Sequence, residues 1–465
     1  MDLVTDVEEF ILDGSRECFK NIFLKYVTVN SAKGIDNINF ESYKSRLDEN
    51  SELIFKKIHN GDYKFSYYSE KLILKGRKKE PRIISIPTIR DKVVLKYIQL
   101  KLKKIYFDIE QKLPQFHIKE FKDYVVNYNY LIKMDIEKYY DSIDHNILEN
   151  ILKLKYIDSR TIELISRAIS RPTINKYELS NKKTKKVKNS KGTPQGLAIS
   201  NILAAIYIKE IDDIFNNRNN IKYIRYVDDI MIFCDEKDAL FLEQEIEENL
   251  KVKLKLDLNN GKTYKNKIDE SVNVSFLGYN YRKVHEKFNG FSIKNENLFK
   301  FENSIVNVFT RFSNDEKMSK EQFIFILNNK ITGSISKKVD TDASRESKYG
   351  WLFFYSQIDD YTIPYRLDNL VDMLIKRFPK CSNIDLDKVK SFKKALNEIR
   401  YNINETTYIH RPDVLDNEER KDLLINVFKI QSSKLNDKNT IDKLYYRLIY
   451  KPIKLLQKDI QQIVS

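Results

Sequence analysis

The sequence predicts an α+β fold, because a strand-rich middle third lies between two parts with helical periodicity. Apolar residues recur every three to four positions through residues 7–27 and again in the last third of the chain. A long apolar stretch at 197–215 predicts a helix that packs on a sheet. The strands of that sheet are expected in short β-branched and aromatic runs at 130–136, 221–227, 230–234 and 274–282.

Residues 67–86, with the sequence YYSEKLILKGRKKEPRIISI, predict two strands that flank a basic turn. Pro87 follows, and residues 90–109 then show the apolar spacing of a long helix. We therefore expect a strand pair with lysines and arginines at its tip, ahead of the strand-rich middle.

The composition is that of a globular protein with several parts. At 465 residues, two or three packed units are expected. The chain is 42% hydrophobic and 32% charged, and no apolar run approaches the length of a membrane span. The acidic start MDLVTDVEEFILDG lacks the features of a signal peptide, so the expected location is the cytoplasm. The three cysteines have no metal-ligand spacing, which argues against a zinc module or a disulfide framework.

The formal net charge of +15 indicates a partner that is rich in phosphates. Lys, Asn, Ile, Tyr and Phe are all heavily used, a bias that A/T-rich coding DNA produces by itself. Part of the lysine excess therefore carries no functional information. Charge favours nucleic-acid binding without saying which nucleic acid is bound.

The stretch YIRYVDDIMIFC predicts a hairpin whose turn is the carboxylate pair Asp228 and Asp229. Aspartate tolerates turn geometry, so a simple polar hairpin tip is an equal alternative for this pair alone. A second β-type run ends at Asp135, where an inward-facing acid on the neighbouring strand would meet the turn. Three converging carboxylates repel one another, and a divalent cation that prefers oxygen ligands, magnesium or manganese, offsets their charge.

Two such ions, roughly 3.5 to 4 Å apart, stabilise the attacking 3′-hydroxyl and the departing pyrophosphate of a phosphoryl transfer. A polymerase and a nuclease both use this constellation. The parts that hold a nucleotide and a template distinguish the two classes.

Seven short motifs follow one another between residues 32 and 279. They are AKGIDNINF (32–40), PRIISIPTIRDKVV (81–94), DIEKYYDSIDH (135–145), KGTPQGLAISNIL (191–203), YVDD (226–229), LNNGKT (258–263) and VSFLGY (274–279). In content and order this set resembles the bacterial reverse transcriptases, the lineage of group II intron proteins, retrons and phage-defence enzymes. A lone YxDD motif is a weak signal, whereas the ordered set is a strong one.

The resemblance implies the fold of a right-hand polymerase. Its fingers would occupy residues 1–130, and its palm, an antiparallel sheet packed on helices, would occupy 131–292. An all-helical, thumb-like C-terminal region would follow at 293–465. The FLGY segment at 276–279 would form a hairpin that grips the primer strand, although apolar packing of its side chains is equally compatible with the sequence.

The resemblance also implies a set of metal ligands. Asp135 and Asp228 would be the principal ligands of two magnesium ions, with manganese as a substitute, and Asp229 would assist. The backbone carbonyl of Ile136 would complete the coordination shell. Lys262 would donate a proton to pyrophosphate, with a solvent-exposed lysine as an equal alternative.

Nucleotide binding is implied at several positions. Tyr140 would lie beneath the sugar, where its bulk clashes with a ribose 2′-hydroxyl and favours dNTPs; a core tyrosine is the alternative. Lys75, Arg77 and Arg82 would clamp the triphosphate, with Arg82 the most specific match because arginine holds phosphate bidentately.

Template binding is implied in the GTPQG segment. Gly192, Pro194 and Gly196 would shape a tight loop close to the templating base pair, and Gln195 would hydrogen-bond in that region. A loop that merely starts a helix is the alternative.

The implied activity is RNA-directed DNA polymerisation, with dNTPs, an RNA template and a DNA product as partners. A structured noncoding RNA is a further candidate partner. RNA-dependent RNA polymerases and template-independent or protein-primed polymerases stay open as alternatives. A non-enzymatic alternative is an RNA-binding, maturase-like scaffold.

The C-terminal part bears on the biological role. Beyond residue 300 it holds only Cys381 and His410 as cysteine and histidine, unlike the Cys/His-containing endonuclease segment of group II intron proteins, and it lacks the Val-Thr-Gly signature of retrons. By analogy it is most like the abortive-infection and defence-associated reverse transcriptases, which makes phage defence the leading role and group II intron or retron types the alternatives. A helical region of this kind is also expected to mediate self-association into a homo-oligomer or to hold RNA.

Overall fold

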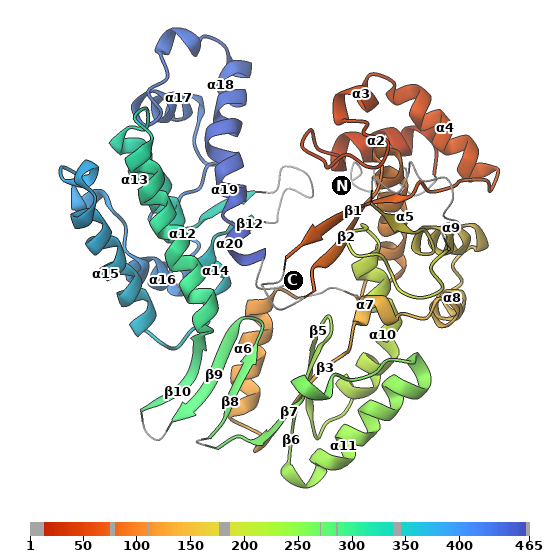
Figure 1. Ribbon diagram of the computed structural model, residues 1–465. Coiled ribbons are helices and arrows are strands. Elements are labelled where there is room, and N and C mark those ends of the chain that lie inside the picture. Colours follow the sequence, from red (N-terminus) through yellow and green to blue (C-terminus); the bar gives the residue numbers. More distant parts are fainter. Residues whose placement is uncertain are drawn as a thin grey trace. The chain divides into compact units, whose positions relative to one another are not determined.

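The computed structural model describes residues 14–74, 80–109, 112–175, 187–269, 271–284, 287–337 and 346–461. The chain folds into two compact units (Figure 1). The first comprises Met1–Gln111 and Tyr128–Asn266, and the second comprises Lys112–Asn127 and Lys267–Ser465. The division into fingers, palm and C-terminal region at residues 130 and 292 stays a prediction.

The first unit begins with helices whose apolar faces contribute to its core. They are α2 (Arg16–Tyr26), α3 (Phe40–Lys44) and α4 (Leu47–His59). The Ser15 hydroxyl caps α2 by accepting a hydrogen bond from the Cys18 N–H at 3.1 Å. Phe19 and Phe23, four residues apart on α2, are fully buried. The predicted helical periodicity is confirmed for residues 16–26, whereas residues 7–13 of the predicted span lie outside the described residues.

The predicted strand pair and the long helix after it are also confirmed. β1 (Tyr68–Ile73) and β2 (Arg82–Ile86) are antiparallel, and the short β4 (Thr173–Ile174) runs parallel to β1. Helix α5 (Ile89–Ile105) follows. The basic tip between β1 and β2 falls on residues 75–79, outside the described residues.

A four-stranded sheet with the order β5-β6-β3-β7 lies in the first unit. β6 pairs antiparallel with both β3 and β5, and its residues after the first are all buried. Helix α10 (Ser200–Asn216) packs on β5, and α11 (Glu236–Glu248) packs on β3, which confirms the predicted packing of a sheet on helices. The strands are β3 (Tyr130–Asp135), β5 (Lys222–Tyr226), β6 (Asp229–Cys234) and β7 (Tyr264–Lys267).

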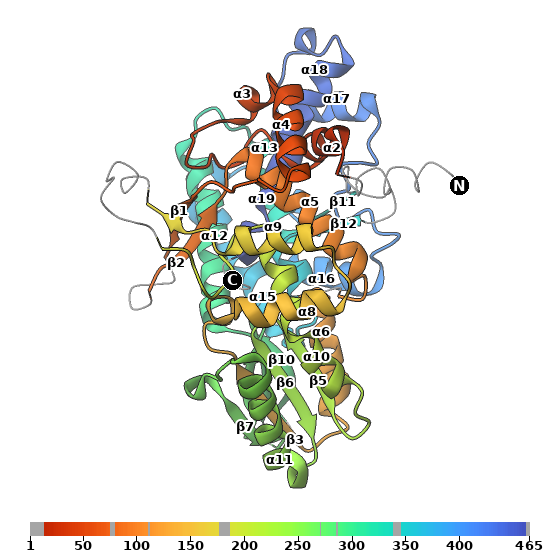
Figure 2. The ribbon, with the colours of Figure 1, turned by 90° about the vertical axis from the view of Figure 1, so that its right-hand side faces the viewer.

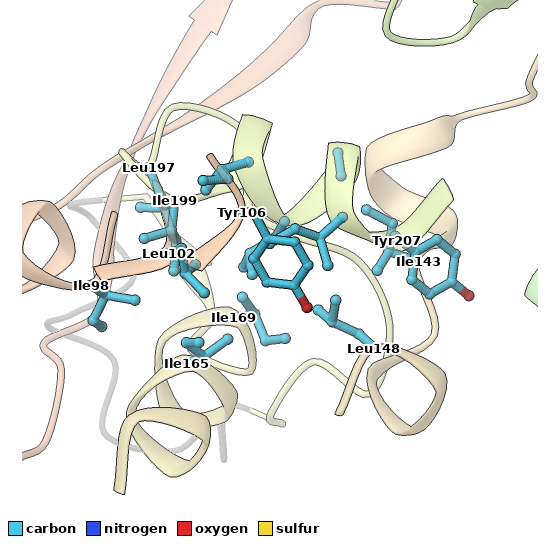
Figure 3. Packing of buried hydrophobic residues seen from close by; sticks show 14 of the residues in the cluster. Ile98, Leu102, Tyr106, Ile143, Leu148, Ile165, Ile169, Leu197, Ile199 and Tyr207 are labelled. Atoms are coloured by element: carbon cyan, nitrogen blue, oxygen red, sulfur yellow. The ribbon is translucent and has the colours of Figure 1, made fainter. Parts of the chain in front are cut away.

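Three further helices complete the described core of the first unit: α7 (Tyr139–Ser142), α8 (His145–Leu154) and α9 (Ser159–Ile169). Helices α8 and α9 lie side by side (Figure 2). Apolar side chains from these two helices and from α5 gather around the ring of Tyr106, as Figure 3 shows for Leu102, Leu148 and Ile169. One continuous core therefore joins segments that are distant in the sequence.

The second unit contains a three-stranded antiparallel sheet with the order β10-β9-β8. Phe121 of α6 (Pro114–Val125) packs on it, with ring centroids 5.2 Å from Tyr281 and 4.8 Å from Phe291. The strands are β8 (Asn273–Phe276), β9 (Tyr279–Val284) and β10 (Phe288–Ile293). The helices after them are α12 (Asn295–Asn314), α13 (Lys320–Thr332), α14 (Trp351–Phe354), α15 (Thr362–Arg377), α16 (Phe392–Tyr401), α17 (Asn417–Asn426), α18 (Lys438–Tyr445), α19 (Lys451–Leu455) and α20 (Lys458–Gln461).

The region after residue 293 is mainly helical, but the prediction that it is all-helical is wrong. β11 (Ser334–Lys337) and β12 (Glu346–Tyr349) form a two-stranded antiparallel sheet. Gly333, with φ 69°, ends α13 where a Cβ atom would lie 2.3 Å from the carbonyl oxygen of Tyr349, so only glycine allows this close approach. Strands of four residues are too short to show a two-residue period beside long helical runs, which explains the error.

No helix in the described part of the chain is both long and apolar enough to cross a membrane. The expected cytoplasmic location stays a prediction.

Candidate active site

Asp228 and Asp229 lie at the hairpin between β5 and β6, but only Asp228 is in its loop. Tyr226 pairs with Asp229 across the hairpin, so the loop residues are Val227 and Asp228. The predicted turn of two carboxylates is therefore wrong by one position, because a two-residue loop matches the twist of the strands. φ is 57° at Val227 and is not positive at Asp228, as in a type II′ turn. Glycine is usual at the first loop position, and a β-branched residue there is strained.

Asp135 ends β3 directly opposite Asp229 of β6. The Ile136 N–H donates to the carbonyl oxygen of Asp228 at 3.0 Å, which makes Asp135 and Asp229 a non-hydrogen-bonded pair of the antiparallel ladder. In such a pair the Cα atoms are about 4.5 Å apart and the side chains leave from the same face of the sheet. Asp135 is only 6% exposed. The fold thus brings the predicted acids together at one end of the central strands β3 and β6.

The electrostatics of Asp228 reflect this crowding. Burial raises the pKa of the Asp228 carboxyl, and the negative charges of Asp229 and Asp135 raise it further, to about 6. A carboxyl in this state binds a proton or a metal cation more readily than an isolated surface aspartate does. The cluster therefore has the electrostatic character of a cation site.

Two lysines lie on the carboxylates. The Nζ atom of Lys262 is 2.8 Å from both carboxylate oxygens of Asp135, and Nζ of Lys133 is 3.2 Å from Oδ1 of Asp229. Burial lowers the pKa of Lys262, but its hydrogen bond to Asp135 and the charges of the acids outweigh burial and raise it. The sequence motifs indicate Lys262 but not Lys133, which lies two residues before Asp135 and so on the same face of β3.

As the side chains stand, no group of three His, Cys, Asp or Glu side chains within the described ranges is arranged to hold a metal ion. The donor chemistry fits one: three carboxylates are hard oxygen ligands, and burial of negative charge favours a divalent cation. The carbonyl of Ile136 leaves β3 on the same side as its N–H, toward Asp228. The metal-ligand roles of Asp135, Ile136, Asp228 and Asp229 stay a prediction.

Tyr140 lies on α7, close to the acidic cluster. Its hydroxyl donates to Oδ1 of Asn201, on α10, at 3.0 Å. Burial raises its pKa to about 12, and the charge of Asp228 contributes to this shift, whereas the charge of Arg82 opposes it. The ring is therefore near both a predicted metal ligand and a predicted phosphate ligand.

The GTPQG segment packs against β2 and α7. The N–H of Ser85 donates to the carbonyl oxygen of Gln195 at 2.7 Å. At Gly196, with φ 101°, a Cβ atom would lie 2.7 Å from Cγ2 of Ile84, so glycine is required there. The hydroxyl of Ser200 donates to the carbonyl oxygen of Pro194 at 2.7 Å and fixes the start of α10. The loop therefore leads into helix α10 and also packs against β2, the strand that carries Arg82.

Arg82 is the first residue of β2. Its Nε atom is buried and has no hydrogen-bond acceptor among the described residues. Its guanidinium therefore keeps a donor that no described side chain uses. The other two residues predicted to clamp a triphosphate, Lys75 and Arg77, lie outside the described residues.

Two more residues near the acids carry no motif in the sequence. Arg225 of β5 donates to the carbonyl oxygen of Val227 and to both carboxylate oxygens of Asp212, on α10. Side chains two residues apart in a strand lie on the same face, so the sequence indicates that Arg225 and Tyr223 share one face of β5. Asp212 gave no signal, because nothing in a helical sequence indicates which strand its side chain meets.

Comparison with known proteins gives one family match. Residues 73–281 match the model of the family described as reverse transcriptase (RNA-dependent DNA polymerase). This span contains the carboxylates of β3, of β6 and of the loop before β6, together with Tyr140, the GTPQG segment and Lys262.

Two curated relatives come from introns. The group II intron-encoded protein LtrA of Lactococcus lactis subsp. cremoris is 25% identical over 191 residues, which cover 39% of this chain and 30% of that protein. The putative COX1/OXI3 intron 2 protein of Saccharomyces cerevisiae is 26% identical over 202 residues, which cover 41% of this chain and 22% of that protein. The chain thus spans less than a third of the length of either relative.

Among solved structures, the apo telomerase of Candida tropicalis, truncated from the C-terminal domain, aligns with a TM-score of 0.38 and 16% identity, over 50% of this chain and 55% of that one. The telomerase of Candida albicans in complex with the TWJ fragment of telomeric RNA aligns with a TM-score of 0.38 and 13% identity, over 91% and 65%. The family match is the informative result: residues 73–281 of this chain match the model of the reverse transcriptase (RNA-dependent DNA polymerase) family, and the chain is distantly similar to intron-encoded proteins, among them a group II intron-encoded protein.

Proposed function

We propose that the chain is an active reverse transcriptase, an RNA-directed DNA polymerase that adds dNTPs and requires magnesium ions. The observation that carries the proposal is the carboxylate cluster, with Asp135 opposite Asp229 and Asp228 in the adjoining loop. The family match over residues 73–281 favours a polymerase over a nuclease with the same acids.

In this proposal, Asp135 and Asp228 hold the cations, Asp229 assists them, and the Ile136 carbonyl completes the shell. When bound, two magnesium ions would activate the primer 3′-hydroxyl and stabilise charge on the departing pyrophosphate. The raised pKa of Asp228 supports the proposal, because burial and, after it, the charges of Asp229 and Asp135 disfavour the ionised carboxylate, and a bound cation would offset this negative charge. In this proposal the reacting phosphate lies beside the acids, at the ends of the central strands β3 and β6.

Lys262 is the proposed proton donor to pyrophosphate. Its ammonium group lies on Asp135, and the acids around it raise its pKa, so it is protonated at neutral pH. Arg82, with its unused Nε donor, is the proposed phosphate ligand in the described part of the chain. Lys75 and Arg77 are proposed to join it on the evidence of sequence resemblance alone.

Sugar and template selection are proposed for two further parts. Tyr140, whose hydroxyl is held by Asn201 near Asp228, is proposed to lie beneath the incoming sugar and exclude a 2′-hydroxyl. Pro194, Gln195 and Gly196 are proposed to contact the templating base pair, and their close packing on β2 supports this role. The FLGY hairpin keeps its proposed role as a primer grip from the resemblance.

The decisive experiment incubates the purified full chain with magnesium, each dNTP or rNTP, and primed RNA or DNA templates. An Asp228→Ala variant serves as the control for contaminating polymerases. We expect dNTP incorporation that depends on an RNA template and on Asp228. Incorporation of rNTPs alone would remove the assignment, and incorporation without any template would indicate a terminal transferase.

We further propose that this activity serves defence against phages. The proposal rests on the resemblance of the sequence to defence-associated reverse transcriptases and on the long, mainly helical region after residue 293. Expression of the chain in a phage-sensitive bacterium should lower the plating efficiency of a panel of phages, and the Asp228→Ala variant should not. Equal plating with both chains across the panel would contradict the defence role and favour an intron- or retron-type role.

A further inference from the structure

We propose that Arg225 is a positioning residue of this active site, which sets the conformation of the loop that carries Asp228. The inference rests on the proposed function, since it concerns the geometry of the same carboxylates. Arg225 itself touches neither the acids nor the predicted substrate, and its effect passes through the backbone of the loop.

The guanidinium of Arg225 joins the loop to a long helix. Its Nη1 atom donates to the carbonyl oxygen of Val227 at 3.0 Å. Its Nε atom donates to Oδ1 of Asp212 at 2.7 Å, and its Nη2 atom donates to Oδ2 of the same carboxylate. The hydroxyl of Tyr223 also donates to Oδ1 of Asp212, at 2.9 Å. The loop is therefore anchored through one planar fork to the C-terminal part of α10.

This fork is shielded from solvent. The side chains of Arg225 and Asp212 are only 13% and 18% exposed. Burial alone would lower the pKa of Arg225, but its hydrogen bonds to Asp212 and the charge of that carboxylate raise it, so the guanidinium stays charged. A buried, bidentate pair of this kind has one favoured arrangement, in contrast to an exposed ion pair.

The carbonyl that Arg225 holds decides the type of turn. It belongs to the peptide group between the loop residues Val227 and Asp228. Rotation of that peptide group converts a type II′ turn into a type I′ turn, in which the second loop residue also has positive φ. In the type I′ turn the Asp228 side chain would leave the backbone in another direction. The hydrogen bond from Arg225 therefore selects the turn that directs Asp228 toward Asp135.

The sequence of the loop does not select this turn by itself. A type II′ turn prefers glycine at its first loop position, where this chain has Val227 at φ 57°. The strain at that position must be offset by contacts from outside the loop. Arg225 supplies one such contact, and the Ile136 N–H supplies another by donating to the carbonyl oxygen of Asp228.

The test removes the fork without leaving a buried charge alone. The double variant Asp212→Asn/Arg225→Met lacks the donor to Val227, and it avoids an unpaired carboxylate. A triple variant adds Val227→Gly, which favours the type II′ turn through the backbone alone. The matched control is Arg218→Met/Glu245→Gln, a pair of similar exposure in the same unit, at 26% and 23%.

The readouts are single-nucleotide incorporation at saturating primer-template, with kcat, the KM for dNTP and the half-saturating magnesium concentration measured separately. We expect the double variant to lose roughly tenfold to a hundredfold in kcat, as for a lost charge-assisted hydrogen bond, and to need more magnesium. Its affinity for primer-template should not change. The triple variant should recover most of the kcat, and the control pair should stay within about twofold of the wild type.

A double variant with kcat and magnesium requirement like those of the control pair would overturn the inference. So would a folded triple variant that recovers nothing. Circular dichroism and thermal melting establish folding. If the double variant does not fold, Arg225→Lys decides in its place, because lysine keeps the charge beside Asp212 but lacks the fork. It should show the same loss and the same recovery with Val227→Gly, and wild-type kinetics would refute the inference. An inactive wild-type chain would instead contradict the proposed function.

Discussion

Within the described residues, two hairpins have loops of two residues, and they use opposite means to form them. In the β8–β9 hairpin the loop residues Leu277 and Gly278 have φ values of 49° and 83°, the pattern of a type I′ turn. Glycine occupies the position where positive φ is largest, as local chemistry prefers. In the β5–β6 hairpin, Val227 occupies a position that suits glycine, and the residue after it is Asp228.

The surroundings of the two loops differ in the same way. Phe276 and Tyr279, which flank the β8–β9 loop, are fully buried, and the carbonyl oxygen of Gly278 accepts hydrogen bonds from neutral side chains of Asn297 and Tyr355. The β5–β6 loop is instead held by a buried arginine and flanked by acids. A hairpin built for packing has residues that suit its backbone. A hairpin that presents charge accepts strain and needs external contacts.

The largest effect should come from the acids themselves. Replacement of Asp135 with asparagine removes a negative charge from the cluster while keeping the shape of the side chain. We expect kcat for dNTP incorporation to fall by about 10³-fold or more, since the proposed cation site loses a ligand. Pre-steady-state incorporation assays measure this. A fall in kcat of less than tenfold would contradict the proposed cation site, and with it the distinction between the charged hairpin and the packed one.

A smaller change is expected in sugar selectivity. The Tyr140→Ala variant removes the ring that is proposed to lie beneath the incoming sugar. The ratio of kcat/KM for a dNTP to that for the matching rNTP should fall by roughly tenfold to a hundredfold, through loss of a steric clash. The Tyr139→Phe variant is the matched control, because Tyr139 is a buried neighbour whose hydroxyl donates to the carbonyl oxygen of Ala204. An unchanged ratio in Tyr140→Ala would mean that Tyr140 is a packing residue only.

The cost of charge at the β5–β6 loop should appear in stability. Asp228 has a pKa of about 6 in the folded, metal-free chain against 3.8 for an ordinary aspartate. Between these pH values the folded chain binds more protons than the unfolded chain, so its stability falls as the pH rises through this window. Above pH 6, the Asp228→Asn variant should be more stable than the wild type by about 2 kcal/mol, allowing for partial exposure of the side chain.

This stability difference is measured by urea unfolding in the presence of EDTA. Hydrogen exchange at the amides of β6 reports the unfolding. The difference should be largest at pH 7.5 and should fade as the pH falls below 3.8, where the carboxyl becomes protonated in both states. Excess magnesium should reduce the advantage of the variant at pH 7.5. A variant that is less stable than the wild type at pH 7.5 without metal would contradict the electrostatic account.

The smallest effects are expected from substitutions that test the backbone strain of the two hairpin loops. Gly278→Val places a β-branched residue at φ 83° and should destabilise the second unit by about 1 to 2 kcal/mol. Val227→Gly relieves the positive φ of the first loop, but it also gives the unfolded chain more freedom, so its net change should stay within about 1 kcal/mol. Unfolding curves of the two variants give the comparison. Equal destabilisation by both substitutions would show that the loops do not differ in strain.

Much of this site could be predicted from the sequence. The strands that end at Asp135 and begin after Asp228 have clear β-type runs, and the ordered motifs located Tyr140, Arg82 and Lys262 within one unit. Local patterns sufficed because each motif lies at the end of a regular element. The predicted loop was wrong by one residue, because aspartate is common in turns and the sequence does not show which of the two aspartates lies in the loop.

Other features could not be predicted, because they depend on contacts between distant segments. Arg225 and Asp212 meet only when α10 packs on β5, and the spacing between them carries no motif. Lys133 was read only as a strand residue, although its position two before Asp135 placed it on the same face. The β11–β12 pair was missed because tertiary pairing, with little help from local preference, stabilises such short strands.

The most direct test of the central claim is to locate a cation. A structure of the full chain with manganese, primer-template and an incoming dNTP would show the ion by its anomalous scattering. We predict a peak between the carboxylate oxygens of Asp135 and Asp228, at a distance of about 2.0 to 2.3 Å from each. A manganese peak elsewhere, with Lys262 still on Asp135 and dNTP bound, would contradict the account.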